Sequence, residues 1–145
     1  MPLSDPHRFG MQLAHLSRGW RAELDRRLAG LALSQARWLV LLQLGRFQEA
    51  PTQRELAQHV GVEGPTLARL LDSLENQGLV KRQAVLEDRR AKKISLSSSA
   101  LPLIEQIESI ADTLREELFA GIADEDLQVA VRVHAQILAN LEKKS

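Results

Sequence analysis

The apolar residues of this 145-residue chain repeat with a helical period almost throughout, and only one stretch departs from that period. Steps of three and four residues place apolar groups on one face of a helix. Between residues 80 and 96 the period falls to two, which is typical of strands. The length suits one domain. These patterns predict a mainly α fold with one small β-hairpin (α+β). The first helical run comprises Leu13, Leu16, Trp20, Leu24, Leu28 and Leu31.

Glycine, proline and capping residues separate the expected helices. We expect helices over about 13–31, 35–46, 53–60 and 64–77, a fifth ending at Gly121 and a last one opening at 124–126. Thr52, with Glu55 three residues later, predicts a capping box. The serines at 97–99 offer N-caps for the fifth helix. The acidic residues at 124–126 fit a helix N-terminus better than a metal site.

Charge is unevenly distributed, although the 19 basic and 19 acidic residues cancel. Residues 1–51 carry seven basic and four acidic groups, and residues 52–97 carry eight basic and six acidic groups. Residues 98–145 carry four basic and nine acidic groups. Residues 81–93 hold six basic groups against two acidic ones, and the link 87–90 is expected to be the charged tip of the hairpin. Such a patch attracts phosphates, although a solvated loop also fits it.

Several functional classes are disfavoured by composition. The chain has no cysteine, which excludes disulfides, thiolate nucleophiles and cysteine-based zinc sites. Its longest apolar run, residues 38–42, is too short to span a membrane, and we expect a cytoplasmic protein with no membrane partner. Its four histidines are scattered, so we predict no metal, no cofactor and no enzymatic activity. They are His7, His15, His59 and His134.

Residues 53–72 have the spacing of a helix-turn-helix. Ala57 is small where the two helices cross, and Gly61 stands in the turn, where a positive φ is easy only for glycine. An ordinary helical hairpin has similar features. The basic hairpin that follows favours a winged helix. The apolar contacts expected to lock the two helices are Leu56, Val62, Leu67 and Leu70.

A winged helix predicts how each part would meet double-stranded DNA. The second helix enters the major groove with residues 63–69, where Arg69 suits a guanine or a phosphate. Hydroxyl and amide groups at Thr52, Gln53 and Thr66 suit phosphates. Arg89 or Arg90 at the hairpin tip suits the DNA backbone or a narrow minor groove. A winged helix that binds only proteins is the alternative, but such a module has no need of these arginines with Lys92 and Lys93.

The hairpin and the second helix also carry a family resemblance. The run 86–97, with Asp88-Arg89-Arg90 followed by Leu96 and Ser97, resembles the wing signature of the MarR family of bacterial transcription regulators. Arg82-Gln83, residues 88–92 and the run 65–75 are similar to the SlyA branch. The resemblance extends from about residue 12 to residue 141. It departs at Gly64, where relatives often carry a polar side chain.

This resemblance implies a homodimer that binds a pseudo-palindromic operator and regulates transcription. Residues 1–34 and 98–145 would form the dimerisation region around a winged helix-turn-helix at 35–97. Asp88 would orient the wing by bonding to an arginine, and Arg90 would read the minor groove. Whether binding represses or activates depends on where the operator lies. The expected DNA-binding set is Thr52, Gln53, Gly64, Pro65, Thr66, Arg69, Arg82, Asp88, Arg89, Arg90, Lys92 and Lys93.

The resemblance further implies an effector site, because MarR-type proteins often bind small aromatic carboxylates or phenolic compounds that release them from DNA. Arginine beside indole suits such a ligand, since guanidinium binds a carboxylate and indole offers apolar contact. Both tryptophans also fit an ordinary apolar core. The residues expected to line this pocket are Arg18, Trp20, Arg21, Ala36 and Trp38.

Overall fold

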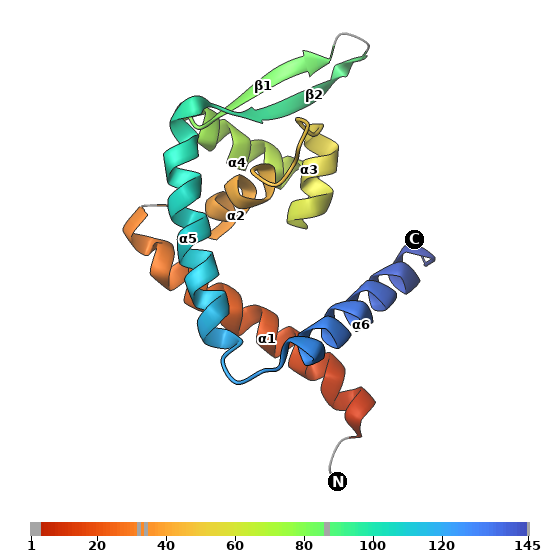
Figure 1. The fold of residues 1–145 in the computed structure, drawn as a ribbon. Helices are drawn as coiled ribbons and strands as arrows, with labels where there is room; N and C mark the ends of the chain where they lie inside the picture. The colour runs from red at the N-terminus through yellow and green to blue at the C-terminus, as the bar shows by residue number, and fades with distance from the viewer. Residues whose placement is uncertain (1–3, 32, 34, 86–87, 145) are drawn as a thin grey trace. The chain divides into compact units, whose positions relative to one another are not determined.

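A computed structural model describes residues 4–31, 33, 35–85 and 88–144. The described residues form a mainly helical fold with one antiparallel hairpin (Figure 1), which confirms the predicted fold class. The first helix begins at residue 5, earlier than its apolar stripe indicated. The elements are α1 (Asp5–Leu28), the 3-10 helix η1 (Ala29–Leu31), α2 (Gln35–Leu44), α3 (Gln53–Val60), α4 (Gly64–Asn76), β1 (Val80–Val85), β2 (Asp88–Leu96), the 3-10 helix η2 (Ser98–Ala100), α5 (Leu101–Leu118) and α6 (Asp124–Glu142).

The chain divides into two compact units, residues 1–112 and 113–145, so the boundary falls within α5. The first unit contains the predicted helix-turn-helix and the hairpin. The second contains the last turns of α5 and the whole of α6. The predicted division at residues 34 and 97 concerns function and stays a prediction.

The core of the first unit is built around α2. This helix is apolar on nearly every side, as its composition indicated, and it packs against α3, α4 and β2. Trp38 is 1% exposed, and Leu41 is completely buried. Burying large apolar side chains is the main source of stability in a domain of this size. The fully buried partners from the other elements include Leu56, Leu67, Leu71, Leu74 and Ile94.

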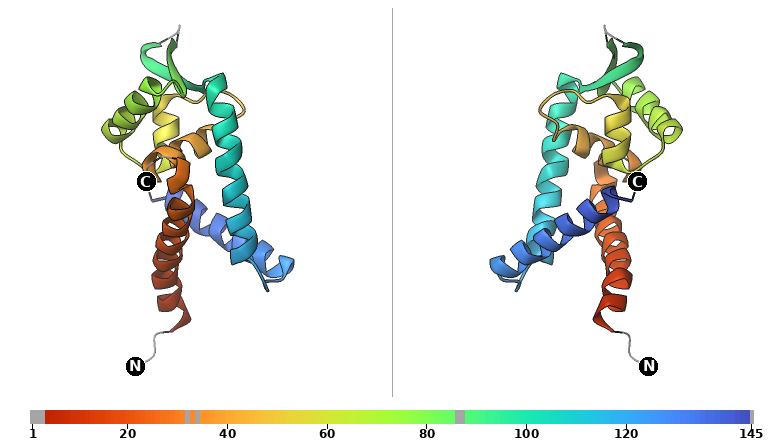
Figure 2. Two further views of the ribbon diagram at one scale, coloured as in Figure 1. Left: turned by 90° about the vertical axis from the view of Figure 1, so that its left-hand side faces the viewer. Right: turned by 90° about the vertical axis from the view of Figure 1, so that its right-hand side faces the viewer.

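The hairpin covers α3 and α4 at one end of this unit, and both side views show it there (Figure 2). Val80 pairs with Leu96 and Arg82 with Ile94, until the register shifts between Ala84 and Val85. Pairing then resumes across the shift, with Val85 opposite Asp88. The prediction that residues 88–90 belong to the connecting link is therefore wrong, because β2 already begins at Asp88.

The serines after β2 do not act as the predicted helix caps. Ser97 precedes η2 but makes no side-chain capping bond. Its Oγ instead donates to the Gly78 carbonyl oxygen, as does Ser99 Oγ at 2.8 Å. Gly78, at φ +75°, lies just before β1, so these bonds join the two ends of the hairpin. After η2, α5 begins at Leu101, and Pro102 lies in its first turn, where its missing amide hydrogen costs little.

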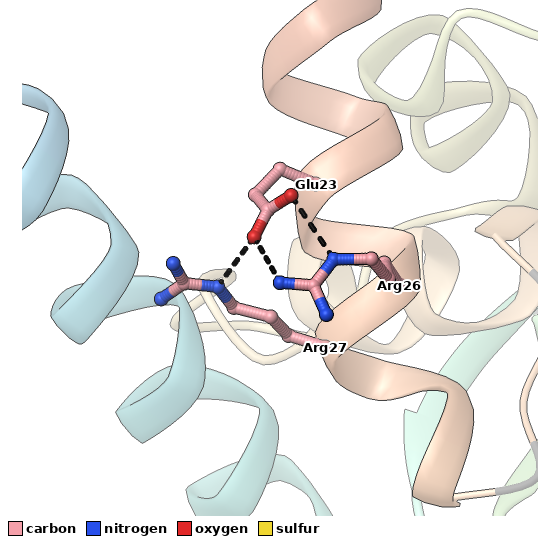
Figure 3. Close-up of polar contacts among 3 residues, drawn as sticks. All are labelled: Glu23, Arg26 and Arg27. Atoms are coloured by element: carbon pink, nitrogen blue, oxygen red, sulfur yellow. Dashed lines mark hydrogen bonds and ion pairs between the residues drawn. The ribbon is translucent and has the colours of Figure 1, made fainter.

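The last turns of α1 combine buried leucines with a cluster of three charged side chains, and Figure 3 shows this cluster. Leu24 and Leu28 are buried. Glu23 Oε1 accepts hydrogen bonds from Arg26 Nη2 at 2.5 Å and Arg27 Nε at 3.0 Å. The Arg26 and Arg27 guanidinium groups lower the pKa of Glu23 from 4.5 to about 2. Farther toward the N-terminus the same helix is exposed, and its large apolar residues there are Phe9, Met11, Leu13 and Leu16.

In the second unit, every described residue of α6 is exposed or half-buried. Three acidic residues occupy its first turn, where they complement the helix dipole as predicted. An exposed apolar stripe follows along the helix. Its large exposed members on the predicted face are Val131, Leu138 and Leu141.

Candidate nucleic-acid interface

The start of α3 is fixed by Thr52. Its Oγ1 accepts a hydrogen bond from the Glu55 amide at 3.1 Å, and Glu55 Oε1 accepts one from the Thr52 amide at 3.2 Å. This is the predicted capping box. The hydrogen bonds from Thr52, together with the nearby charge of Lys93, lower the pKa of Glu55. The Thr52 hydroxyl hydrogen can still be donated to a phosphate.

The same segment joins the hairpin to α3. The Ile94 amide donates to the Pro51 carbonyl oxygen at 2.9 Å, and Thr52 forms a β-bridge with Lys93. Residues 51 and 52 are thus joined to β2 by backbone contacts, although they lie outside its two-stranded sheet. Because these are backbone contacts, the position of the hairpin base relative to α3 does not depend on flexible side chains.

The turn between α3 and α4 has the predicted geometry. Gly61 has a left-handed backbone, at φ +82°, and its amide donates to the Ala57 carbonyl oxygen at 2.9 Å. Ala57 is buried, as the close approach of the two helices requires. Among the expected apolar contacts, Val62 and Leu70 are only half-buried. Leu71 and Leu74 are fully buried instead, although they were not among the predicted contacts.

The outer face of α4 is the part of the helix-turn-helix available to a partner. Its buried leucines lie on the opposite face. Pro65 and Arg69 are exposed, and Thr66 is half-buried. No ion pair holds Arg69 among the residues that the structure describes. Its guanidinium is therefore available to a guanine or a phosphate.

An open groove of about 870 Å³ lies between α3, the start of α4 and the hairpin. Five of the predicted DNA-binding residues line it, namely Thr52, Gln53, Gly64, Arg82 and Lys92. Pro65, Thr66, Arg69 and Lys93 do not. The groove also contains Arg54 and Gln58, which the sequence reading missed. Arg54 could have been predicted from the sequence, because it is a basic residue in the first turn of the helix that begins at Gln53.

Arg82 of β1 is bound by two carboxylates of α4. Its Nη2 donates to Asp72 Oδ1 and, at 3.0 Å, to Glu75 Oε1. The side chain is only 16% exposed. Hydrogen bonding to these two carboxylates raises the pKa of Arg82, and the guanidinium lowers the pKa of Glu75. The structure therefore places this predicted DNA contact in an ion-pair network with α4.

The far end of the hairpin holds the remaining predicted contacts. Asp88, Arg89 and Arg90 form the first residues of β2, but their side chains lie outside the described part of the structure. Lys92 and Lys93 are exposed. The roles expected for the three tip residues stay predictions.

Comparison with known proteins agrees with this arrangement. A family model described as the MarR family matches residues 30–91. The transcriptional regulator PA3341 is 61% identical, with 93% of this chain and 98% of that chain covered and a TM-score of 0.88. The chain belongs to the MarR family.

Two more distant structures share the MarR fold at 24% identity. MepR of S. aureus, solved as a complex with DNA, has a TM-score of 0.76 and coverage of 96% of this chain and 99% of its own. CouR of Rhodococcus jostii RHA1, bound to p-coumaroyl-CoA, has a TM-score of 0.79 and coverage of 89% and 90%. Membership of this family of transcriptional regulators confirms the broader resemblance; the SlyA branch stays a prediction.

The structure describes all five residues expected to hold an effector in this MarR chain, and their burial differs. Trp38 lies in the core, and its Nε1 donates to Asp25 Oδ1 at 3.0 Å. Trp20 and Ala36 are half-buried, while Arg18 and Arg21 are exposed on α1. Arg18 lines an open groove with other α1 residues, and that groove includes none of the other four.

The described residues include neither a metal-binding cluster nor a membrane-spanning helix. Within the described part of the chain, no three His, Asp or Glu side chains lie close enough together to hold a metal ion. Of the helices in the structure, none combines the length and the apolar character needed to cross a bilayer.

Proposed function

We propose that this MarR-family protein binds double-stranded DNA sequence-specifically, as a homodimer on a pseudo-palindromic operator, and so regulates transcription. The main support is that Arg69 is exposed on α4, while Thr52, Gln53, Arg54 and Lys92 line the groove between α3, the start of α4 and the hairpin. Polar and basic groups from α3 and the hairpin therefore flank the helix that would read base edges. Phosphate contacts position such a module, and base contacts give its specificity.

The homodimer is supported by large apolar side chains that are exposed on α1 and on α6, each considered by itself. Leu13 and Leu16 of α1 are 47% and 64% exposed, and Val131 and Leu138 of α6 are 63% and 60% exposed. Extensive apolar surface of this kind marks an interaction site. A two-fold dimer would present two α4 helices to half-sites about 10 bp apart or a multiple of that spacing.

Mobility shifts over a salt series test DNA binding, using palindromic promoter fragments selected from the source genome. Replacing Arg69 or Arg90 with alanine should cost about 1–3 kcal/mol of binding free energy, and loss of a phosphate contact should flatten the salt slope by about one unit. Lys143→Ala removes one positive charge beyond α6 and serves as the control. Unchanged affinity in both arginine variants would refute this interface, and a wild-type protein that shifts no DNA would favour the protein-binding alternative.

The effector site that we propose includes fewer residues than the five expected from the sequence. Arg18 and Arg21 are exposed and able to reach a carboxylate, whereas Trp38 is already packed and hydrogen-bonded. CouR was solved with p-coumaroyl-CoA, an aromatic acyl ligand. We expect a small aromatic carboxylate or phenol to weaken operator binding, and Arg18→Ala to reduce that response. A titration in which none of these compounds changes operator affinity would remove the proposal.

A further inference from the structure

Arg82 lies on the face of the hairpin that covers the helices. Directly paired residues of antiparallel strands share a face, and Arg82 pairs with Ile94, which is completely buried. A guanidinium is costly to bury without partners. With its side chain only 16% exposed, Arg82 therefore depends on the groups that surround it.

Two carboxylates of α4 supply those partners. Asp72 and Glu75 are three residues apart, so they lie on neighbouring positions of one helix face. Both accept hydrogen bonds from Arg82 Nη2. Asp72 and Glu75 are themselves 61% and 42% exposed, so neither is needed to fill the core. The contact joins β1 to the second half of α4.

This contact lies beside the proposed DNA-binding groove. Arg82 lines that groove together with Gly64 and Ala68 of α4 and with Lys92 of the hairpin. The spacing between α4 and the hairpin determines whether both can contact one operator at once. At the α3 side this spacing is set by backbone bonds from residues 51 and 52. At the α4 side the Arg82 network joins the two elements.

We propose that Arg82 is a positioning residue: through Asp72 and Glu75 it holds the hairpin at a fixed distance from α4, and it does not itself bind DNA. The inference rests on the proposed DNA-binding function. To reach a phosphate, Arg82 would have to leave two charge-assisted hydrogen bonds, each stronger than a neutral one. The raised pKa of Arg82 and the lowered pKa of Glu75 agree with a network that is charged at neutral pH.

The double variant Asp72→Asn/Glu75→Gln tests this role, because two explanations predict opposite results. Removing two negative charges from a DNA-binding unit should by electrostatics alone tighten binding to any DNA. If the carboxylates position the hairpin through Arg82, operator affinity should instead fall about tenfold. Affinity for unrelated DNA should stay the same or rise, so the ratio of specific to non-specific binding falls.

Three further measurements complete the test. Glu105→Gln/Glu116→Gln removes the same charge from exposed positions of α5 and should leave the binding ratio unchanged. Arg82→Lys keeps a positive charge that could serve a phosphate but cannot provide the planar guanidinium fork, and it should weaken operator binding. Hydrogen exchange of the β1 and β2 amides should accelerate in Asp72→Asn/Glu75→Gln while the circular dichroism stays unchanged.

The outcomes separate this inference from the proposed function. Operator binding by Asp72→Asn/Glu75→Gln as tight as wild type, or tighter, overturns the positioning role, as does wild-type binding by Arg82→Lys. A wild-type protein that does not distinguish operator from unrelated DNA contradicts the proposed function instead. In that case the positioning role is tested by hydrogen exchange alone. Unaltered exchange of the hairpin amides in Asp72→Asn/Glu75→Gln would show that the Arg82 network does not hold the hairpin in place.

Discussion

At the scale of single residues, ion pairs with carboxylates determine which basic side chains are available to contact DNA. Arg26 and Arg27 share Glu23, and Arg82 is held by α4. Arg69 has no such partner among the described residues. Counting positive charges along the chain therefore overstates what is available to DNA, because several of them are already neutralised by neighbouring carboxylates.

The Glu23 cluster predicts a specific pH dependence of stability. Its folded pKa of about 2 lies below the ordinary 4.5, so the folded state binds this proton more weakly than the unfolded state does. The stabilisation is complete above pH 4.5 and is lost as the pH falls toward 2. Urea unfolding across this range should show a steeper decline in the free energy of unfolding for wild type than for Glu23→Gln. Glu105→Gln should follow wild type, and parallel curves for wild type and Glu23→Gln would contradict the role of the cluster.

At the scale of elements, the glycine that joins α3 to α4 permits a matched comparison. Gly61 has φ +82° and open space around its Cα, so Gly61→Ala should cost only backbone strain, about 1–2 kcal/mol. Gly19 also has open space but lies inside α1, where its backbone is helical. Gly19→Ala should therefore stabilise the fold by about 0.4–1 kcal/mol. Denaturant unfolding measures both, and equal effects of the same sign would show that backbone conformation is not what distinguishes the two sites.

Elements were predictable from sequence where the signal was local. The capping box of Thr52 and Glu55 and the turn at Gly61 involve residues a few positions apart, and both are confirmed. The start of β2 at Asp88 depends on pairing with Val85 across an irregular register, which periodicity does not reveal. The bonds from Ser97 and Ser99 to Gly78 and from Arg82 to α4 join separate segments. They were missed because they require the tertiary fold.

At the scale of the whole molecule, the exposed stripe of α6 predicts the assembly state. Leu138→Glu would place a charge within the apolar surface proposed to meet a second copy, where an unpaired carboxylate is costly to bury. Sedimentation should show the dimer dissociation constant rising by about a hundredfold. Gln136→Glu adds the same charge on the opposite face of α6 and should leave the dimer intact. Identical sedimentation of wild type and Leu138→Glu would place the interface elsewhere.

The burial of Trp38 gives this molecule an optical property of its own. The chain contains two tryptophans and no tyrosine, so its indole emission arises from Trp20 in α1 and Trp38 in α2. One indole is sealed in the interior and hydrogen-bonded to Asp25, while the half-buried Trp20 is the one that a dissolved quencher reaches first. A compound that contacts Trp20 would change the accessible part of the emission and leave the emission of Trp38 as an internal reference. Fluorescence of the unlabelled protein can thus locate an effector without any attached dye.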